Sequence, residues 1–503
     1  MGYILTIDKG TTVVKSILFD QDGTEMAVVR LDEDTSHPQS GWHEEDVELA
    51  WENTAEMVRQ VIRSSGVDVR EILAIGVTAH MGGLILLDSS NHPLYRNILW
   101  DDNRAARIVE EWDQQGTLEK LVAEGGQAVL AGLSVPLLRW FMLHEPEVLK
   151  RAARLCNTKD YLVMRLARSL GTDESDAGWM PIDIRKRKYS KKVWELAGVA
   201  EYGGLFPEIY RSMDVVGGIS PEASRQLGLP EGIPVIAGIG DANASTIGVG
   251  VINPGQGVTI VGTSLLNNII TREVMMEPIG LGFNIPTVQN YWMRMLPNTG
   301  GGSINLRWLV DLAYRDLVNP YEVLDQEARG VDPGSSGVTY HPYISSAGVV
   351  APFYHLGARA QFTGLHSNVS RPELARAVIE GLAYSIRDCF GACPEDLHEL
   401  RISGGSARSQ VLCQTVADVI GKPVNLMTGE EAAARGVAII AATSVGLFPT
   451  LDQAVEQFVK VRQVFMPDPS RSGFYDERFA LFQQIRTAMM PTWSARQKFN
   501  EAG

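Results

Sequence analysis

"TIDKGTTVVKSILFDQDG", residues 6–23, places a polar turn between two runs of apolar and β-branched residues. Such runs favour strands, and Asp22-Gly23 at the end of the stretch is a common signal for a hairpin turn. We therefore predict a strand, a tight turn, a second strand, a hairpin turn and a third strand from residue 3 onward. The tight turn holds four residues that a ligand could contact: Asp8, Gly10, Thr11 and Thr12.

Helical and strand patterns alternate after this hairpin. Apolar residues recur at helical spacing over 46–65, and the apolar run 72–79 predicts another strand. The second half repeats the organisation, with a strand and a glycine-rich hairpin in 232–270 and a strand, a glycine turn and a helix in 401–424. The apolar stripe of 476–493 predicts a terminal helix that packs back on the second half.

The alternation indicates an α/β fold. A chain of 503 residues is too long for one hydrophobic core, so we predict two domains, 1–252 and 253–503. The Pro-Gly turn at 252–255 is the expected boundary.

Composition excludes several classes of function. Acidic residues outnumber basic ones by 60 to 45, which disfavours a broad surface for nucleic acid. The basic stretch 185–192 is a local exception that we interpret as a solvated surface. The N-terminus lacks the pattern of a signal peptide, and the longest apolar run, 436–448, is too short to cross a bilayer, so no membrane association is expected. The four cysteines form no C-x-x-C motif, so we expect reduced thiols and a cytoplasmic location.

The turn after the first strand has the chemistry of a phosphate site. Its backbone N–H groups can converge on an anion, and Gly10 lets a phosphate approach the main chain. Thr11 and Thr12 add hydroxyl donors, Lys15 adds positive charge, and Asp8 would hold Mg²⁺ through water. A polar hairpin turn without a ligand is the alternative.

A second hairpin of the same kind favours the phosphate interpretation. The stretch 260–270 again reads as strand, turn and strand, with Gly262, Thr263 and Ser264 in the turn. Two such hairpins indicate a nucleotide cleft between two domains, and no Walker P-loop motif occurs in the chain. The pattern resembles the superfamily of sugar kinases, actin and the Hsp70 chaperones, whose paired RNase H-like domains close on ATP.

Four longer stretches sharpen the resemblance. They are similar to the signatures of the FGGY carbohydrate kinases, and within these to pentulose kinases such as xylulokinase: 157–178, 358–386, 400–424 and 430–442. The resemblance runs from residue 3 to about residue 485 and implies a kinase that uses ATP and Mg²⁺ on a sugar. Dimers are common in that family, so a homodimer is one expectation that the sequence leaves open.

Asp241, in "VIAGIGDANAS", falls where the family places its catalytic base, at the end of a buried strand. A sugar hydroxyl needs a proton acceptor as it attacks the γ-phosphate, and a carboxylate supplies one. The residues alone leave a second interpretation, in which Asp241 caps the start of a helix.

The sugar side of the site is expected in two segments, 78–83 and 99–105, which look like the family's Gln-Met-His-Gly and Trp-x-Asp-x-Arg motifs. Asp102 and Arg104 would contact substrate hydroxyls, or hold their loop in place as an ion pair. The other substrate candidates are His80, Met81, Trp100 and Asp241. His80 is equally well explained as a buried structural histidine.

The chain departs from xylulokinases beside the expected sugar. Gly82 follows Met81 where xylulokinases carry histidine, and Ala242 follows Asp241 where they carry asparagine. These differences put xylulose itself in doubt and leave phosphoryl transfer untouched.

For the nucleotide, Gly301 belongs to a glycine-rich helix entrance at 298–308. The family's adenosine turn corresponds to Gly404, Gly405 and Ser406. We therefore predict an ATP-dependent kinase acting on a hydroxyl of a ketopentose or short polyol. Its rivals are a chaperone-type ATPase on the same fold and, less well supported, a phosphohydrolase that acts without any sugar.

Overall fold

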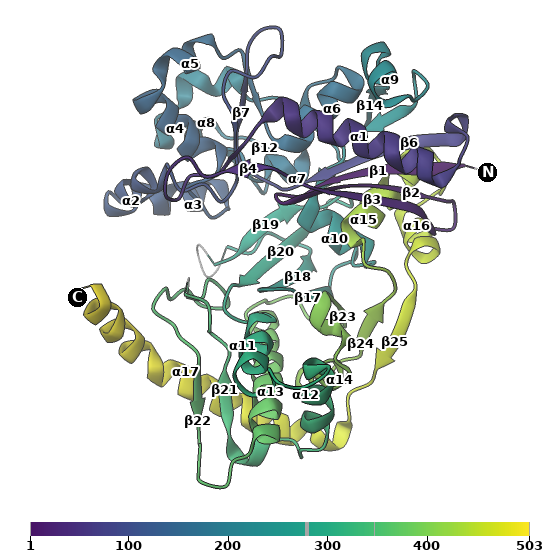
Figure 1. The fold of residues 1–503 in the computed structure, drawn as a ribbon. Helices are drawn as coiled ribbons and strands as arrows, with labels where there is room; N and C mark the ends of the chain where they lie inside the picture. The colour runs from purple at the N-terminus through teal and green to yellow at the C-terminus, as the bar shows by residue number, and fades with distance from the viewer. Residues whose placement is uncertain (1, 277–280, 347, 502–503) are drawn as a thin grey trace.

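The computed structural model describes residues 2–276, 281–346 and 348–501. Two mixed sheets lie one above the other, each in its own lobe, with helices on their outer faces and between them (Figure 1). The α/β, two-lobed architecture confirms the expected fold class.

The first sheet begins with the predicted meander. Its strands, in spatial order, are β14 (Val215–Gly218), β15 (Pro234–Ile236), β6 (Ile72–Ala79), β1 (Tyr3–Lys9), β2 (Val13–Phe19) and β3 (Glu25–Asp32), and β16 (Ile239–Gly240) pairs with the end of β6. β1 to β3 are antiparallel, whereas β6 runs parallel to β1, β15 and β16. All residues of β1 are buried, as in a central strand covered on both faces.

The second sheet repeats this topology. Its order is β19 (Phe283–Pro286), β20 (Trp292–Asn298), β18 (Leu265–Thr271), β17 (Gln256–Val261), β23 (Glu399–Ser403), β24 (Val424–Met427) and β25 (Val461–Phe465). An antiparallel meander is again followed by two parallel strands, and an antiparallel strand closes the edge. β17 therefore corresponds to β1, and the expected recurrence of strand, turn and strand is confirmed.

Smaller sheets and helices complete the first lobe. One small sheet has three strands: β4 (Thr35–Ser36), β5 (Glu44–Glu45) and β8 (Asn97–Ile98). The other small sheets are strand pairs: β7 (Ile85–Leu87) with β9 (Arg154–Cys156), β10 (Gly171–Asp173) with β13 (Glu208–Tyr210), and β11 (Ile182–Asp183) with β12 (Lys188–Tyr189). Its helices are α1 (Val47–Ser65), α2 (Ala106–Gln114), α3 (Thr117–Gly125), α4 (Ser134–His144), α5 (Pro146–Arg151), α6 (Thr158–Ala167), α7 (Glu174–Ala177), α8 (Lys191–Ala197), α9 (Pro221–Leu227) and α10 (Asp241–Gly248), with 3₁₀ turns η1 (Val69–Glu71) and η2 (Ala200–Leu205).

The second half of the chain adds one strand pair and the remaining helices. These are β21 (Thr339–His341) with β22 (Gln361–Thr363), α11 (Ile304–Ala313), α12 (Pro320–Arg329), α13 (Arg371–Gly391), α14 (Gln410–Ile420), α15 (Ala432–Ser444), α16 (Leu451–Phe458) and α17 (Ser472–Glu501), and the 3₁₀ turns η3 (Ser335–Gly337), η4 (Gly405–Arg408) and η5 (Pro469–Arg471). Tyr475, Phe482 and Trp493 of α17 lie in the core formed by α13 and the second sheet, so the predicted terminal helix packs on the second half.

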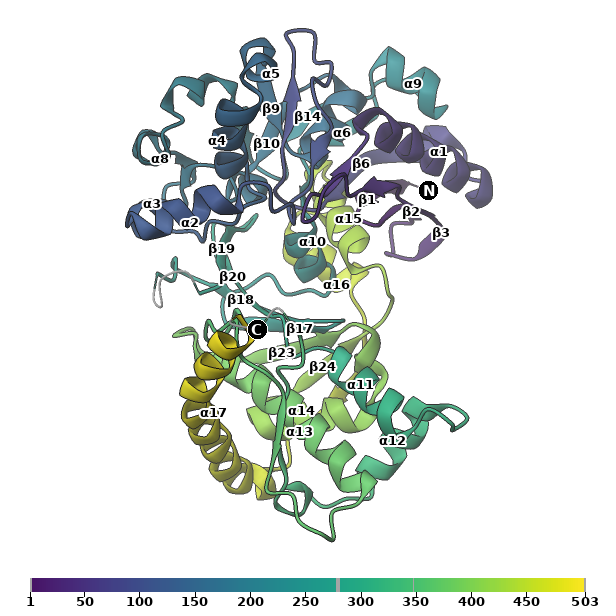
Figure 2. The same ribbon diagram turned by 60° about the vertical axis from the view of Figure 1, so that its left-hand side comes forward.

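α10 and α15 cross between the two sheets (Figure 2). Gly248 and Gly436 lie at the crossing, where the backbones touch: a Cβ on Gly436 would lie 1.8 Å from the carbonyl oxygen of Ala244. α15 also packs on β1 and β6 of the first sheet. Through this helix, the second half of the chain contributes to the core of the first lobe.

The four cysteines are free thiols, three of them buried, as expected. Among the described residues, no helix combines the length and the apolar character that crossing a membrane requires.

Candidate active site

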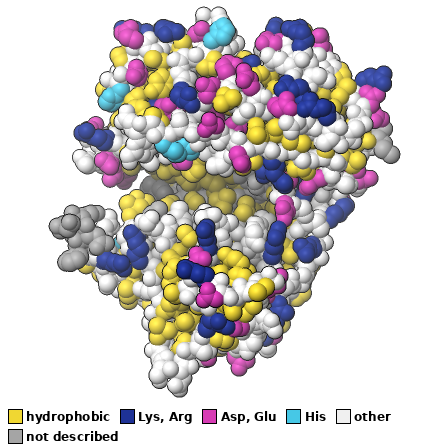
Figure 3. All heavy atoms as spheres, in the orientation of Figure 1, with side chains coloured by type: hydrophobic (Ala, Val, Ile, Leu, Met, Phe, Trp, Pro, Cys, Tyr) yellow, Lys and Arg dark blue, Asp and Glu magenta, His cyan; other side chains and the backbone are white. Residues whose placement is uncertain are grey.

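A cavity of about 590 Å³ opens between the lobes, and the molecular surface is visibly hollowed there (Figure 3). The first lobe contributes Asp8, Gly10, Lys15 and Asp241 to its lining, and the second contributes Gly404 and Gly405. Residues predicted from both halves of the sequence therefore meet at one cavity.

Asp8 lies near the end of β1, where the chain turns into β2. The backbone N–H of Gly10 donates to the carbonyl oxygen of Val13 over 2.9 Å, which closes the turn. Lys15 Nζ lies 3.8 Å from Asp8 Oδ2. Burial raises the pKa of Asp8 to about 6, although Lys15 opposes the rise.

Asp241 is the first residue of α10 and follows β16 directly. Because β1 and β16 both pair with β6, Asp8 and Asp241 come from strand ends on either side of that strand. Burial, followed by the negative charge of Asp8, raises the pKa of Asp241 to about 7. Its Oδ1 accepts from the N–H of the next residue, Ala242, over 2.7 Å. The N-cap position of α10 belongs to Gly240, so Asp241 does not cap the helix, and the capping interpretation is wrong.

The turn after β23 forms the opposite wall of the cavity. Gly404 has a φ of 93°, and a Cβ there would lie 2.7 Å from the carbonyl oxygen of Val261. Only glycine fits this close approach to β17. Ser403, Ala407 and Arg408 line the cavity beside it.

The second hairpin turn, residues 262–264, packs against the glycine-rich entrance to α11. The backbone N–H of Ser303 donates to the carbonyl oxygen of Gly262 over 2.7 Å. A Cβ on Gly302 would lie 2.1 Å from the carbonyl oxygen of Thr263. The described lining of the cavity does not include several predicted nucleotide residues: Thr11, Thr12, Gly262, Thr263, Ser264, Gly301 and Ser406. Their contacts with a nucleotide stay predictions.

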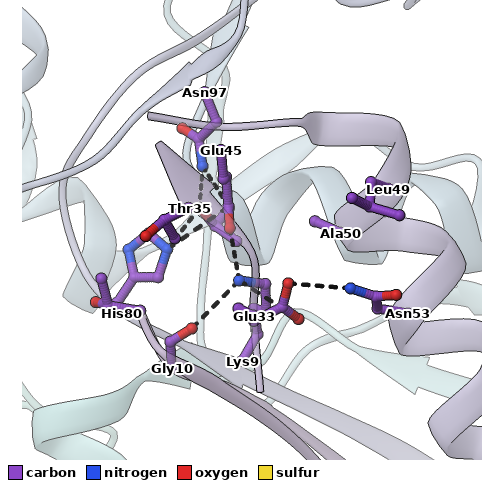
Figure 4. Close-up of polar contacts among 12 residues, drawn as sticks. Lys9, Gly10, Glu33, Thr35, Glu45, Leu49, Ala50, Asn53, His80 and Asn97 are labelled. Atoms are coloured by element: carbon purple, nitrogen blue, oxygen red, sulfur yellow. Dashed lines mark hydrogen bonds and ion pairs between the residues drawn. The ribbon is translucent and has the colours of Figure 1, made fainter. Parts of the chain in front are cut away.

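A buried ionic network supports the first turn from behind (Figure 4). Lys9 Nζ donates to Glu45 Oε2 over 2.7 Å and to the carbonyl oxygen of Gly10 over 3.2 Å, and it lies 3.8 Å from Glu33. The Lys9 side chain is fully buried. The network fixes the residue between Asp8 and Gly10, and through it the turn.

Asp102 and Arg104 stabilise their own loop. Asp102 accepts from the backbone N–H of His43 over 2.6 Å and from the Arg104 side chain. The Arg104 guanidinium also donates to Glu44 and lies 3.9 Å from the centre of the Trp42 ring. These contacts favour the interpretation in which the pair holds the loop.

Trp100 occupies the exposed tip of the same loop. Its side chain is 42% exposed, and its Nε1 donates to Thr11 Oγ1 over 3.2 Å. This bond ties the predicted sugar loop to the predicted phosphate turn.

His80 and Met81 are buried below the site. His80 Nε2 lies 3.1 Å from Thr158 Oγ1, and its contacts favour the structural interpretation (Figure 4). Met81 fills the space beside Gly240, where a Cβ would lie 2.4 Å from Met81 Cγ. Met81 packs in one apolar cluster with Trp179 and Phe283.

Several residues at the cavity were not predicted from the sequence. Glu431 binds Lys15 over 2.8 Å, and Ser245 and Arg462 are further lining residues. Glu431 lies in one of the four stretches that resemble the FGGY signatures, but no local pattern indicates that it contacts a lysine 416 residues away.

Comparison with known proteins identifies the family. The model for the N-terminal domain of the FGGY family of carbohydrate kinases matches residues 3–248, and that for the C-terminal domain matches residues 257–445. The chain belongs to the FGGY family of carbohydrate kinases. It is a sugar kinase, a phosphotransferase that uses ATP, and the chaperone and phosphohydrolase alternatives lose their support.

The relatives of this FGGY kinase act on small sugars and polyols. It is 30% identical to an erythritol kinase of Brucella abortus, over 97% of each chain, and 28% identical to a probable L-xylulose kinase of Pasteurella multocida, over 97% of this chain and 99% of the relative. A ligand-bound xylulose kinase structure from Lactobacillus acidophilus superimposes with a TM-score of 0.90 at 25% identity, covering 98% of this chain and all of the other.

Proposed function

We propose that this kinase transfers the γ-phosphate of ATP to a hydroxyl of an uncharged ketopentose or four- to five-carbon polyol, with Asp241 as the general base. The observation that supports this best is the convergence of Asp8, Asp241 and the Gly404–Gly405 turn on one cavity. The relatives named for erythritol and L-xylulose support the acceptor class.

Asp241 accepts the proton of the attacking hydroxyl. In the reaction, that oxygen forms a bond to the γ-phosphorus, the bond from phosphorus to the β,γ-bridging oxygen breaks, and ADP leaves. A pKa of about 7 suits this role, because about half of the carboxylate is then ionised near neutral pH and the group is basic enough to take the proton.

Lys15 and the backbone of the first turn orient the phosphates. The Lys15 ammonium group lies in the cavity beside Asp8, where it can neutralise charge that gathers on phosphate oxygens in the transition state. Trp100 of the sugar loop donates to Thr11 of the turn, so these two segments of the first lobe are held together. Closing the second lobe over them would exclude water from the reacting groups.

Asp8 fits a role in holding Mg²⁺. It is a carboxylate on the cavity wall, and no group of three or more ligating side chains suited to a metal occurs among the described residues. Mg²⁺ usually takes one or two protein carboxylates and keeps water and phosphate oxygens as its other ligands. When bound, it would supply positive charge to the phosphates.

An acceptor panel tests the proposed function. Purified protein is given ATP, Mg²⁺ and one acceptor at a time, D-xylulose, L-xylulose, D-ribulose, erythritol or gluconate, and ADP release is followed with a coupled assay. We expect ADP formation that depends on a ketopentose or on erythritol, with gluconate inactive because it carries a charge. ADP release independent of every acceptor, or a preference for gluconate, would contradict the proposal.

A further inference from the structure

A buried polar cluster lies behind the segment that carries the proposed base. Lys159 Nζ donates to Asp160 Oδ1 over 2.8 Å and lies 3.2 Å from Asp173 and 3.3 Å from Asp176. All four side chains are essentially inaccessible to solvent. So much buried charge is costly, and the proposed reaction uses none of these groups directly.

The cluster contacts both ends of residues 237–240, which lead into Asp241. At the first end, Lys159 Nζ donates to the carbonyl oxygen of Ala237 over 3.2 Å. At the other end, the backbone N–H of Gly240 donates to Ser175 Oγ over 2.9 Å. The residue immediately before Asp241 is therefore held by a side chain of α7.

Asp173 sets the position of Ser175. Its carboxylate accepts from the backbone N–H of Ser175 over 2.9 Å and from that of Asp176 over 3.3 Å, which fixes the start of α7. It also accepts from Ser212 Oγ over 2.7 Å and lies beside Lys159. Asp173 therefore links Lys159, which binds Ala237, to Ser175, which binds Gly240.

The segment itself has little freedom to move. Gly238 has a φ of 78°, and a Cβ there would lie 2.1 Å from the carbonyl oxygen of Val77 in β6. A Cβ on Gly240 would collide with Met81. The pairing of β16 with β6 and the two cluster hydrogen bonds together hold the chain where it enters α10.

We propose that Ser175 is a positioning residue for phosphoryl transfer, and that the Lys159–Asp173–Ser175 cluster holds residues 237–240 so that Asp241 meets the acceptor hydroxyl. The inference rests on the proposed role of Asp241 as the base. Ser175 acts through the Gly240 peptide and touches no reacting atom in this scheme. The rate depends steeply on the distance between the base and the acceptor hydroxyl, so a displacement of about 1 Å can lower it about 100-fold.

The test compares two serine truncations within the same cluster. Ser175→Ala removes the acceptor of the Gly240 N–H, whereas Ser212→Ala removes an equally buried hydroxyl that bonds Asp173 and does not contact residues 237–240. We expect Ser175→Ala to lower kcat about 10- to 100-fold with KM for ATP unchanged, and Ser212→Ala to change kcat by less than about 2-fold. Ser175→Thr, which keeps the hydroxyl, should restore most of the rate.

A double-mutant cycle separates positioning from a general loss of structure. In an Asp241→Asn background, Ser175→Ala should cause no further loss of kcat, because the group it positions is absent. Equal effects of the two serine truncations, or a full additional loss in the double variant, would overturn the proposal. If Asp241→Asn itself left kcat near the wild-type value, the assignment of the base would fail instead, so the two failures are distinguishable.

Discussion

Lys15 and Glu431 form an ion pair at the cavity between the lobes, with Nζ 2.8 Å from Oε2. Lys15 comes from β2 of the first lobe, and Glu431 directly precedes α15. Arg30 of β3 binds the other oxygen of the same carboxylate. One glutamate from the second half of the chain therefore engages two cations of the first sheet, of which only Lys15 lines the cavity.

Lys15→Met should weaken ATP binding. A hydrogen bond to a charged group contributes about 1.5 to 3 kcal/mol, so we expect the KM for ATP to rise about 10-fold or more in steady-state kinetics. Arg30→Met is the matched control, because it removes the other partner of Glu431 and leaves the cavity lining intact. If both variants raised KM equally, the effect would come through Glu431 and not from contact of Lys15 with the phosphates.

The activity should depend on the ionisation of Asp241. Because the base must be deprotonated, kcat/KM should fall about 10-fold per pH unit below an apparent pKa of about 7, and level off above it. Asp8→Asn removes a negative neighbour, so in that variant the acid limb of the residual activity should move to lower pH.

Glu431→Gln provides the control for this shift. The charge of Glu431 contributes to the raised pKa of Asp8 but not to the raised pKa of Asp241. In this variant, the fall of kcat/KM at low pH should occur near the same pH as in the wild type. If kcat/KM of the wild type stayed constant from neutral pH down to the ordinary pKa range of an aspartate, the assignment of the base would be contradicted.

Much of this fold could be predicted from local sequence patterns. Alternating apolar runs and the Asp22-Gly23 turn give β1 to β3, and the bounds of α1 follow from the Asp46 cap and Gly66. The repeat of strand, turn and strand near residue 260 indicated the second sheet. These features are local, so they need no knowledge of tertiary contacts.

The long-range features could not be predicted in this way. The crossing of α10 and α15 depends on the fit of Gly248 against Gly436, and nothing near either glycine specifies the other. Lys9 lies in a strand pattern, but lysines are almost never fully buried, so its network with Glu45 was not expected. Asp102 and Arg104 bind partners in a separate segment, and these contacts favour one of the two interpretations left open by the sequence.

Gly436→Ala should disrupt the crossing of α10 and α15. The added methyl group would lie 1.8 Å from the carbonyl oxygen of Ala244, and overpacking of this kind costs about 1 to 3 kcal/mol. We expect a clear fall in Tm by differential scanning calorimetry. Gly391→Ala, at a helix end with open space for a Cβ, is the control and should leave Tm unchanged. A wild-type Tm for Gly436→Ala would show that the helices can separate without cost.

Lys9→Met should destabilise the protein strongly. It leaves the buried carboxylates of Glu45 and Glu33 without their cation, and breaking a buried ion pair from one side costs about 3 to 5 kcal/mol. Burial opposes the charged form of Glu45, but the contacts with His80 and Lys9 hold its pKa at about 2. Removing Lys9 should therefore raise that pKa. Because the variant starts from a lower stability, its acid unfolding, followed by circular dichroism, should begin at higher pH.

Lys9→Met combined with Glu45→Gln is the control, because the double variant removes the most closely paired charges together. It should recover part of the stability lost in the single variant. A single variant as stable as the wild type would mean that the network does not hold the turn.

The most direct test of the central claim is a comparison of ATP binding and sugar phosphorylation in Asp241→Asn. We expect calorimetric titration to give a Kd for ATP within about 2-fold of the wild type, because the substitution removes one charge and little volume. With the acceptor that the panel identifies, kcat should fall by about 10²- to 10⁴-fold. Turnover close to that of the wild type, with ATP binding intact, would contradict the account, because the proton of the attacking hydroxyl would then leave without this carboxylate.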